Sequence, residues 1–179
     1  MKILVTGACG NIGKKLVPYL RKCGHEVTRL DISQEYAKDY IKHDIRDPIG
    51  AIGTFDFDVV YHLAGIVSRI VSEEARMLTV STNIDGTYKV ARFCQAIGAK
   101  MINFSTSEVY GNTDKIMKES EFCFPNNLYG LSKLIAEQLV EYEVKSGLDA
   151  VTVRPFMLYD EDETRGIHRS AMIRFAEAL

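Results

Sequence analysis

Short apolar runs alternate with longer amphipathic segments along this chain. Such alternation is typical of a parallel β-sheet whose strands are joined by helices that pack on its faces. The apolar runs predict strands at residues 2–6, 26–30, 40–43, 57–63, 101–104 and 150–153. No stretch between them reads as an interdomain linker, so we expect one α/β domain over residues 1–179.

The amphipathic segments predict helices at residues 11–23, about 72–97 and 129–146, with a last amphipathic segment at 168–179. Gly24 and Gly98 follow the first two, and glycine is common just past a helix end. In the third helix the apolar stripe Leu131, Ile135 and Leu139 predicts the side that faces the core. Residues 112–127 have no clear period and are a candidate lid or binding loop.

Composition excludes several classes of partner. The chain is 46% hydrophobic and 26% charged with a formal net charge of -2, which favours neither nucleic acid nor an anionic membrane. No apolar run approaches the roughly 18 residues of a membrane span, and no leader precedes Ile3. The four cysteines lack a Cys-x-x-Cys pair, which predicts a reduced, cytoplasmic setting. The four histidines are dispersed without metal-ligand spacing, so no metal site is expected.

Three glycines, Gly7, Gly10 and Gly13, lie where the first strand runs into the first helix. Glycines permit a tight turn and a close backbone approach, and the helix N-terminus offers unpaired N–H groups to a pyrophosphate. The spacing Gly-x-x-Gly-x-x-Gly departs from the usual Gly-x-Gly-x-x-Gly fingerprint. A tight turn that binds no ligand is therefore the alternative.

Asp31 closes the second strand, about 20 residues beyond the glycines, where an acid can accept hydrogen bonds from the adenosine ribose. A carboxylate there would repel a 2′-phosphate, so the cofactor predicted is NAD and not NADP. The alternative is a solvated turn residue.

Tyr129 and Lys133 are four residues apart and so share one face of the predicted helix. A free tyrosine, with a pKa of about 10, is only about 0.1% phenolate at pH 7. A nearby lysine ammonium and the positive nicotinamide ring of NAD⁺ would both favour the phenolate, which could then take a proton from a sugar hydroxyl. The alternative is a solvated charged stripe of Lys133, Glu137, Glu141 and Lys145.

Seven short stretches occur in one order: "VTGACGNIG", "HDIRD", "HLAG", "TNIDGT", "STSEVYG", "YGLSK" and "RPFMLYD". Together they resemble the motifs of the extended short-chain dehydrogenase/reductase family, the NAD-dependent nucleotide-sugar epimerases, dehydratases and decarboxylases. The resemblance covers the N-terminal, cofactor-binding part of that family, from residue 3 to the end of the chain.

The resemblance implies a Rossmann-type doubly wound parallel sheet with helices on both faces, and a homodimer joined through a four-helix interface. It also implies NAD as cofactor. The cofactor-binding residues it implies are Gly7, Gly10, Asn11, Ile12, Gly13, Asp31, Asp44, Ile45, Leu63, Ala64, Gly65, Asn83, Tyr129 and Lys133.

The resemblance also implies catalytic roles on a nucleotide-sugar substrate. Tyr129 is the base, Lys133 lowers its pKa and holds the nicotinamide ribose, and Thr106 shares the proton of the substrate hydroxyl. Glu108 is either the base that removes the C5 proton in a dehydratase or a turn acid that points to solvent. We therefore expect hydride chemistry through a 4-keto sugar, with dehydration placed ahead of decarboxylation and of simple 4-epimerisation.

Four neighbouring residues have less defined roles. Ser105 and Tyr110 are expected to be structural, while Arg154 and Pro155 line the nicotinamide pocket by family likeness or simply end a strand.

Members of the family are considerably longer than this chain, and their C-terminal part supplies most contacts to the substrate. Here Tyr159-Asp160-Glu161 stands at the usual Tyr-Gly-Pro, and Met157 replaces a common asparagine. We expect the substrate part to be largely absent, because the chain is either a fragment or a shortened member. A non-catalytic NAD-binding module is the rival hypothesis.

Overall fold

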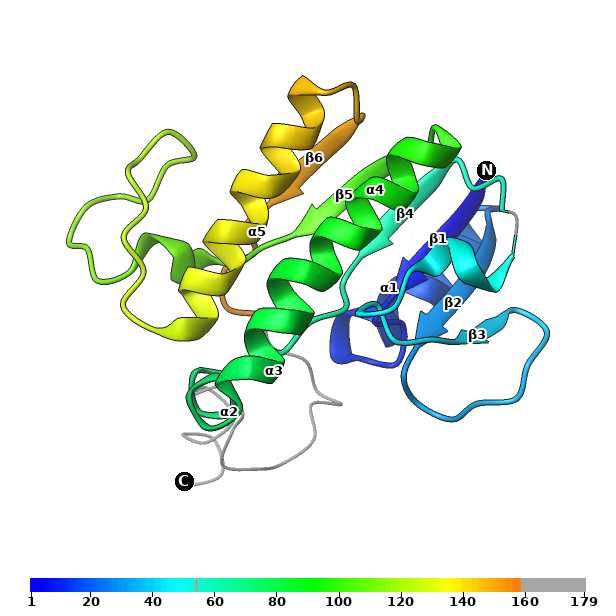
Figure 1. The fold of residues 1–179 in the computed structure, drawn as a ribbon, viewed down its shortest axis with the longest axis horizontal. Helices are drawn as coiled ribbons and strands as arrows, with labels where there is room; N and C mark the ends of the chain where they lie inside the picture. Colours follow the sequence, from blue (N-terminus) through cyan, green and yellow to red (C-terminus); the bar gives the residue numbers. More distant parts are fainter. Residues whose placement is uncertain (54, 159–179) are drawn as a thin grey trace.

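The computed structural model describes residues 1–53 and 55–158. Its centre is a six-stranded parallel sheet in the order β3-β2-β1-β4-β5-β6 (Figure 1). The strands are β1 (Lys2–Thr6), β2 (Glu26–Asp31), β3 (Tyr40–Lys42), β4 (Val59–His62), β5 (Lys100–Phe104) and β6 (Ala150–Val153). This order is that of the Rossmann fold, in which the direction of winding changes between β1 and β4. The predicted fold class and all six strands are confirmed.

Helices cover both faces of the sheet. α1 (Asn11–Lys22) buries Val17 and Leu20 against a cluster that includes Ile3 and Val5. α4 (Thr87–Ile97) and α5 (Leu128–Lys145) lie side by side on the opposite face, in contact with a second cluster that contains Leu4. Since side chains alternate along a strand, successive residues of β1 feed the two cores in turn.

The prediction of one continuous helix over residues 72–97 is wrong. The chain forms α2 (Arg69–Glu74), α3 (Arg76–Val80), a π-helical turn η2 (Ser81–Gly86) and then α4. Ala75 breaks the first two, with φ -115° and ψ 53°. The π turn lies where Asn83 is fully buried and where a Cβ at Gly86 would meet Ile45 Cδ1 at 2.9 Å. These long-range contacts have no trace in the hydrophobic period.

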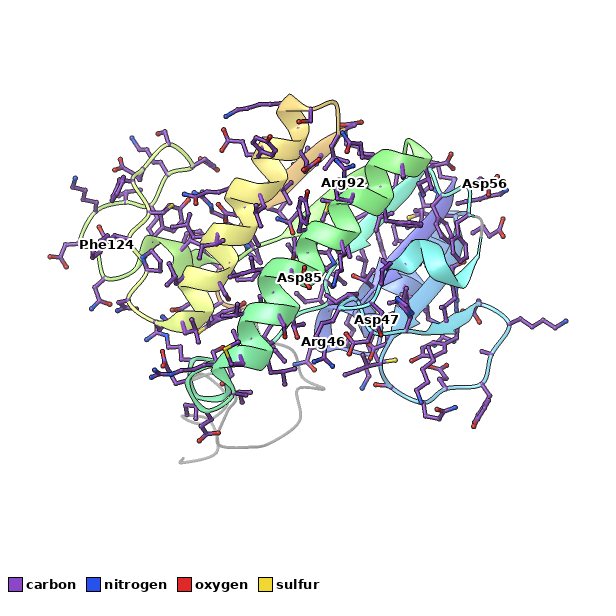
Figure 2. All side chains as sticks on the ribbon, in the orientation of Figure 1. Arg46, Asp47, Asp56, Asp85, Arg92 and Phe124 are labelled. Carbon is purple, nitrogen blue, oxygen red and sulfur yellow. The ribbon has the colours of Figure 1, made fainter. Side chains whose placement is uncertain are left out.

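The apolar stripe predicted to face the core on α5 is also wrong. Leu131 is 43% exposed, and Ile135 and Leu139 are only half-buried. The buried face of α5 consists of Gly130, Ser132, Lys133, Ala136, Glu137, Val140 and Glu143. Two of the charged side chains are tolerated there because each has an arginine partner. Arg92, which is labelled in Figure 2, pairs with Glu143 at 3.1 Å, and the partner of Glu137 is Arg154.

Other predicted segments fare better. α1 and α5 lie within one residue of the predicted helices, and no helix or strand occurs between η3 (Ser107–Tyr110) and α5, as expected for a loop. Phe124 is 74% exposed in that loop (Figure 2). A short 3-10 helix, η1 (Ile49–Ile52), was not predicted, and the segment at 168–179 falls outside the described residues. No helix in the described part of the chain is long and apolar enough to cross a membrane.

Candidate active site

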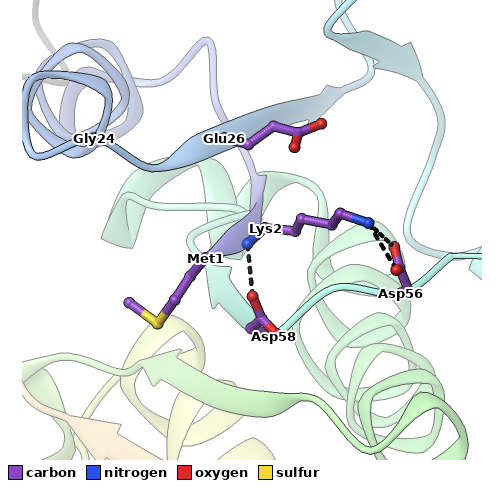
Figure 3. Close-up of a pocket in the computed structure, with 6 residues that line it drawn as sticks. All are labelled: Met1, Lys2, Gly24, Glu26, Asp56 and Asp58. Carbon is purple, nitrogen blue, oxygen red and sulfur yellow. Dashed lines mark hydrogen bonds and ion pairs between the residues drawn. The ribbon is translucent and has the colours of Figure 1, made fainter.

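Functional residues gather at the carboxyl edge of the sheet. A hollow at the opposite, amino edge holds none of the predicted site residues (Figure 3). There Lys2 Nζ pairs with Asp56 at 2.7 Å, and the Lys2 amide donates to Asp58. Open α/β sheets bind ligands beyond the carboxyl ends of their strands, so that hollow is a surface feature and the site lies at the other edge.

The glycine turn requires two of its three glycines for steric reasons. Gly7 has φ +68°, and a Cβ there would meet the Ala64 nitrogen at 2.6 Å. A Cβ at Gly13 would meet the carbonyl oxygens of Gly7 and Ala8, both at 2.6 Å. Strand β1, the loop after β4 and the start of α1 therefore approach one another more closely than a side chain allows.

The first turn of α1 is open to an anion. Its N-cap is Gly10, no side chain caps it, and it contains no acidic residue. The first intrahelical bond is from Lys14 N to Gly10 O, which leaves the amides of Asn11, Ile12 and Gly13 without helical acceptors. Uncapped N–H groups at the positive end of a helix dipole fit a pyrophosphate group.

Asp31 is fixed against this turn. Its Oδ2 accepts a hydrogen bond from the Cys9 amide at 2.9 Å, and its Oδ1 accepts from the Ser33 amide and hydroxyl. Oδ1 thus uses both of its lone pairs, whereas Oδ2 keeps one that can accept a hydrogen bond from a ribose hydroxyl. The carboxylate thus links the end of β2 to the glycine turn and is more than a solvated turn residue.

The side chains of Asp44 and Ile45 lie in different surroundings. Asp44 is half-buried and pairs with Arg46 at 2.6 Å, a contact that holds the pKa of Asp44 below its usual value. Ile45 is only 3% exposed and packs against Gly86. The side chain of Ile45 therefore belongs to the core, and of the pair only Asp44 presents its side chain at the surface.

Asn83 ties the loop after β4 to α5. Its Oδ1 accepts from the Ile66 amide at 2.8 Å, and its Nδ2 donates to the Ile66 carbonyl and to Ser132 Oγ. A Cβ at Gly65 would meet Asn83 Oδ1 at 3.0 Å. Ser132 in turn donates to the carbonyl of Tyr129. The side chain of Asn83 is fully buried and positions the segment of Leu63, Ala64 and Gly65 beside α5.

The structure brings Thr106, just after β5, together with Tyr129 in the first turn of α5, and Lys133 follows one helical turn later. Thr106 Oγ1 accepts from the Glu108 amide at 3.2 Å, and its hydrogen bond to Tyr129 lowers the pKa of that phenol. Burial is the larger effect, however, and raises the pKa of Tyr129 above 10.0 overall, with the Glu108 charge adding to it. The lowering expected from Lys133 is therefore not found in the protein alone.

Lys133 is buried, with 5% exposed, and burial lowers the pKa of its amine to about 8 although Glu137 opposes the change. Within residues 1–53 and 55–158, no group accepts a hydrogen bond from its Nζ. Glu137 is 8% exposed, so the alternative of a solvated charged stripe is excluded for Lys133 and Glu137, while Glu141 and Lys145 do form an exposed pair. A lysine that is buried along its length, and whose amine has no acceptor in the described part of the chain, fits the hydroxyls of a cofactor ribose.

The guanidinium of Arg154 is bound by other side chains of the protein. Its guanidinium donates to both oxygens of Glu137, at 2.7 to 3.1 Å, and to the Tyr110 hydroxyl. Tyr110 is therefore structural, as predicted, and Arg154 has a structural part beyond that of a strand end. Ser105 is buried, and its hydroxyl has no partner in the described part of the chain.

Two contacts near the candidate site were not predicted from the sequence. His62 bridges Thr6 at 2.8 Å and Thr87 at 3.0 Å in a fully buried network, and burial, followed by the Lys133 charge, lowers the pKa of His62 to about 3. His62 lies in the stretch "HLAG" and Thr87 in "TNIDGT", so these two motifs were the sequence signal for the contact. Arg69 contacts both oxygens of Glu108, so a Glu108 that points to solvent is excluded. No local pattern marks this contact.

The chain is similar to several known proteins in sequence and in fold. The chain is 29% identical over 182 residues to UDP-glucuronic acid decarboxylase 6 of Arabidopsis thaliana, a match over 89% of this chain and 51% of that protein. Pal from Bacillus thuringiensis is 30% identical with a TM-score of 0.89, over 99% of this chain and 63% of that one. A Bacillus cereus UDP-glucuronic acid 4-epimerase, solved with UDP-glucuronic acid and NAD, is 31% identical with a TM-score of 0.78, over 86% and 56%.

Fold and site together define a Rossmann-type α/β protein of the short-chain dehydrogenase/reductase class. Residues 3–179 match the NAD dependent epimerase/dehydratase family, and the chain belongs to that family. It spans about half the length of the curated relatives that it matches. The residues described contain no group of three or more His, Cys, Asp or Glu side chains placed to share a metal ion.

Replacing Lys133 with methionine should stabilise the protein at pH 7. Because burial depresses the pKa of this amine from 10.5 to about 8, the folded state binds fewer protons than the unfolded state between these values. Stability thus rises with pH across this window, and the amine costs up to about 3 kcal/mol below it. Urea unfolding should show a gain for Lys133→Met at pH 7 that fades above about pH 10.

Lys145→Met is the matched control, since Lys145 lies on the same helix with its side chain 72% exposed. The free energy of unfolding of Lys145→Met should differ from that of the unmodified protein by less than about 0.5 kcal/mol at either pH. A loss of stability in Lys133→Met at pH 7 would contradict the burial argument. Glu137 keeps its Arg154 partner in this variant, so no new unpaired charge confuses the comparison.

Proposed function

We propose that this protein acts on a nucleotide sugar through a 4-keto intermediate with NAD as cofactor, and that residues 1–179 are its cofactor-binding domain. The observation that carries the proposal is the buried amine of Lys133, held one helical turn from Tyr129 and free of any acceptor among the described residues. A structural lysine would be paired or exposed. One that is neither is suited to a ligand.

The residues present would hold NAD along the carboxyl edge. The amides of Asn11, Ile12 and Gly13 would bind the pyrophosphate, the carboxylate of Asp31 the adenosine ribose, and Lys133 the nicotinamide ribose. When bound, NAD supplies the acceptor for the hydride that leaves the sugar carbon.

The proton of the sugar hydroxyl goes to Tyr129. Burial raises the pKa of the phenol, so at pH 7 the base form must come from charges added at the site. With a pKa of about 8 the Lys133 amine is still mostly an ammonium at pH 7. The Thr106 hydroxyl, already hydrogen-bonded to Tyr129, provides a second donor that stabilises the phenolate and orients the substrate hydroxyl.

Glu108 changes the order of the possible reactions. Both of its oxygens accept hydrogen bonds from Arg69, and Asn127 donates a further one to Oε2, so it is a poor free base for a C5 proton. A 4-keto sugar acid is a β-keto acid and loses carbon dioxide without any C5 deprotonation. Decarboxylation, or epimerisation of an acidic sugar, is therefore favoured here over dehydration.

Tyr129→Phe should lower turnover of a UDP-sugar by about 10²- to 10⁴-fold and leave NAD affinity within a few-fold, because it removes the base and little else. Tyr142→Phe, a change on the exposed surface of the same helix, should not alter turnover. NADH formation in a single turnover and NAD titration report the two effects. If the protein expressed from its full reading frame binds NAD but converts no member of a UDP-sugar panel, it is a non-catalytic NAD-binding module.

Asp31→Ala should weaken NAD binding and shrink the preference over NADP, because the carboxylate that would accept the ribose hydroxyls and repel a 2′-phosphate is lost. Ser33→Ala, which removes one donor to Asp31 but keeps its charge, should retain the preference. Calorimetric titration with NAD and with NADP measures the two affinities of each protein. Equal affinity of the unmodified protein for NAD and NADP would refute the role of Asp31.

We also propose a homodimer through α3 and α5, since exposed apolar side chains lie on these two helices, which contact one another. They include Met77 at 79%, Leu78 at 40% and Leu131 at 43% exposed. Leu131→Glu should shift the mass in analytical ultracentrifugation from dimer to monomer. The exposed change Ile116→Glu, in the loop before α5, is the control and should leave the dimer intact. A monomeric unmodified protein would end this proposal.

A cytoplasmic location is part of the proposal. It is supported by the four cysteines, all of which are free thiols.

A further inference from the structure

Arg69 makes a two-point contact at the edge of the candidate active site. It begins α2, and its Nε and Nη2 donate to Glu108 Oε2 and Oε1, each at 2.8 Å. Asn127, the N-cap of α5, donates to the same carboxylate at 3.0 Å. The guanidinium is thus fixed relative to Thr106 and Tyr129, which flank Glu108 in space.

The backbone before Arg69 is held in an unusual conformation. Ser68 has φ +143° and is the one non-glycine residue with positive φ in the described part of the chain. Its hydroxyl accepts from the Val71 amide, and Glu73 on the same short helix accepts from the Leu128 amide at 3.1 Å. Strain of this kind persists only where the surroundings impose it, and it is found most often at functional sites.

Arg69 retains donors that Glu108 does not use. A guanidinium carries five N–H donors, and its Nη1 has no partner within residues 1–53 and 55–158. The side chain is 60% exposed, although Glu108 itself is 26% exposed. The guanidinium therefore offers an unused, planar pair of donors to solvent beside the catalytic residues.

The charges decide what these donors would bind. Glu108 lies near enough to Tyr129 for its charge to raise the pKa of the phenol, so an unpaired Glu108 would repel an anionic sugar from the same place. Arg69 neutralises that carboxylate and still has donors for a second one. A neutral sugar would leave those donors to water and gain nothing from them.

We propose that Arg69 is a specificity-determining residue, which binds the carboxylate of an acidic sugar while it stays paired with Glu108. This proposal rests on the proposed function and narrows it to nucleotide sugars of the uronic acid class. Arg69 acts in binding and does not exchange protons with the substrate.

The test compares two UDP-sugars that differ only at C6. Calorimetry on the NAD-loaded protein, expressed from its full reading frame, should show UDP-glucuronate binding about ten- to a hundredfold more tightly than UDP-glucose, the range expected of one charge-assisted pair. Arg69→Gln should bring the two affinities within about threefold, mainly through weaker binding of UDP-glucuronate. Arg76→Gln removes a charge from the adjoining helix, where Arg76 pairs with Glu73, and should preserve the preference.

A second measurement needs no substrate and shows whether the variant still folds. With ¹³Cζ-labelled tyrosine, assigned through Tyr129→Phe, Arg69→Gln should raise the pKa of Tyr129 because Glu108 loses its counter-charge. Arg76→Gln should not change it. Equal affinities of the unmodified protein for the two sugars, or an Arg69→Gln variant with an unchanged preference, would overturn the role of Arg69 alone. Absence of binding by either sugar would overturn the proposed function as well.

Discussion

A lysine amine inside the protein is the constraint around which this site is built. Lys133 lies one turn below Tyr129, and its charge is costly in an apolar interior unless an anion is near. Glu137, one turn further, only partly offsets that cost, because both of its oxygens are bound by Arg154 and neither accepts a hydrogen bond from Lys133. The same guanidinium donates to Tyr110. The pair of Glu137 and Arg154 therefore fixes α5, the end of β6 and η3 relative to one another.

The rest of the site depends on close backbone approach. Gly7, Gly13 and Gly65 lie where the turn after β1 meets the loop after β4, at the point where the sheet changes its direction of winding. Asn83 then connects that loop to α5 through Ser132. The cofactor side and the catalytic side are thus coupled by a few fully buried polar contacts, and neither half is positioned by loops alone.

Local pattern was sufficient for the sheet and insufficient for the charged helix. The strands follow from alternation and from apolar runs, because each strand buries its own residues. The stripe of Leu131, Ile135 and Leu139 misled because Glu137 and Glu143 are buried with partners distant in sequence. The break at Ala75 and the pairing of Arg69 with Glu108 depend likewise on contacts between elements. Thr106, Tyr129 and Lys133 could be predicted as candidates from their motifs, since spacing of that kind is recorded in the sequence itself.

The buried His62 has a consequence for how this edge of the sheet is polarised. A neutral imidazole donates through one nitrogen and accepts through the other, so its bonds to Thr6 and Thr87 run in one direction. Thr6 also accepts from the Ala64 amide, which extends the line into the loop beside Gly7. The orientation of each hydroxyl is then set by the next, from the head of α4 to that loop. A replacement at Thr6 or Thr87 would have to preserve the donor-to-acceptor direction of these hydrogen bonds as well as the volume of the side chain.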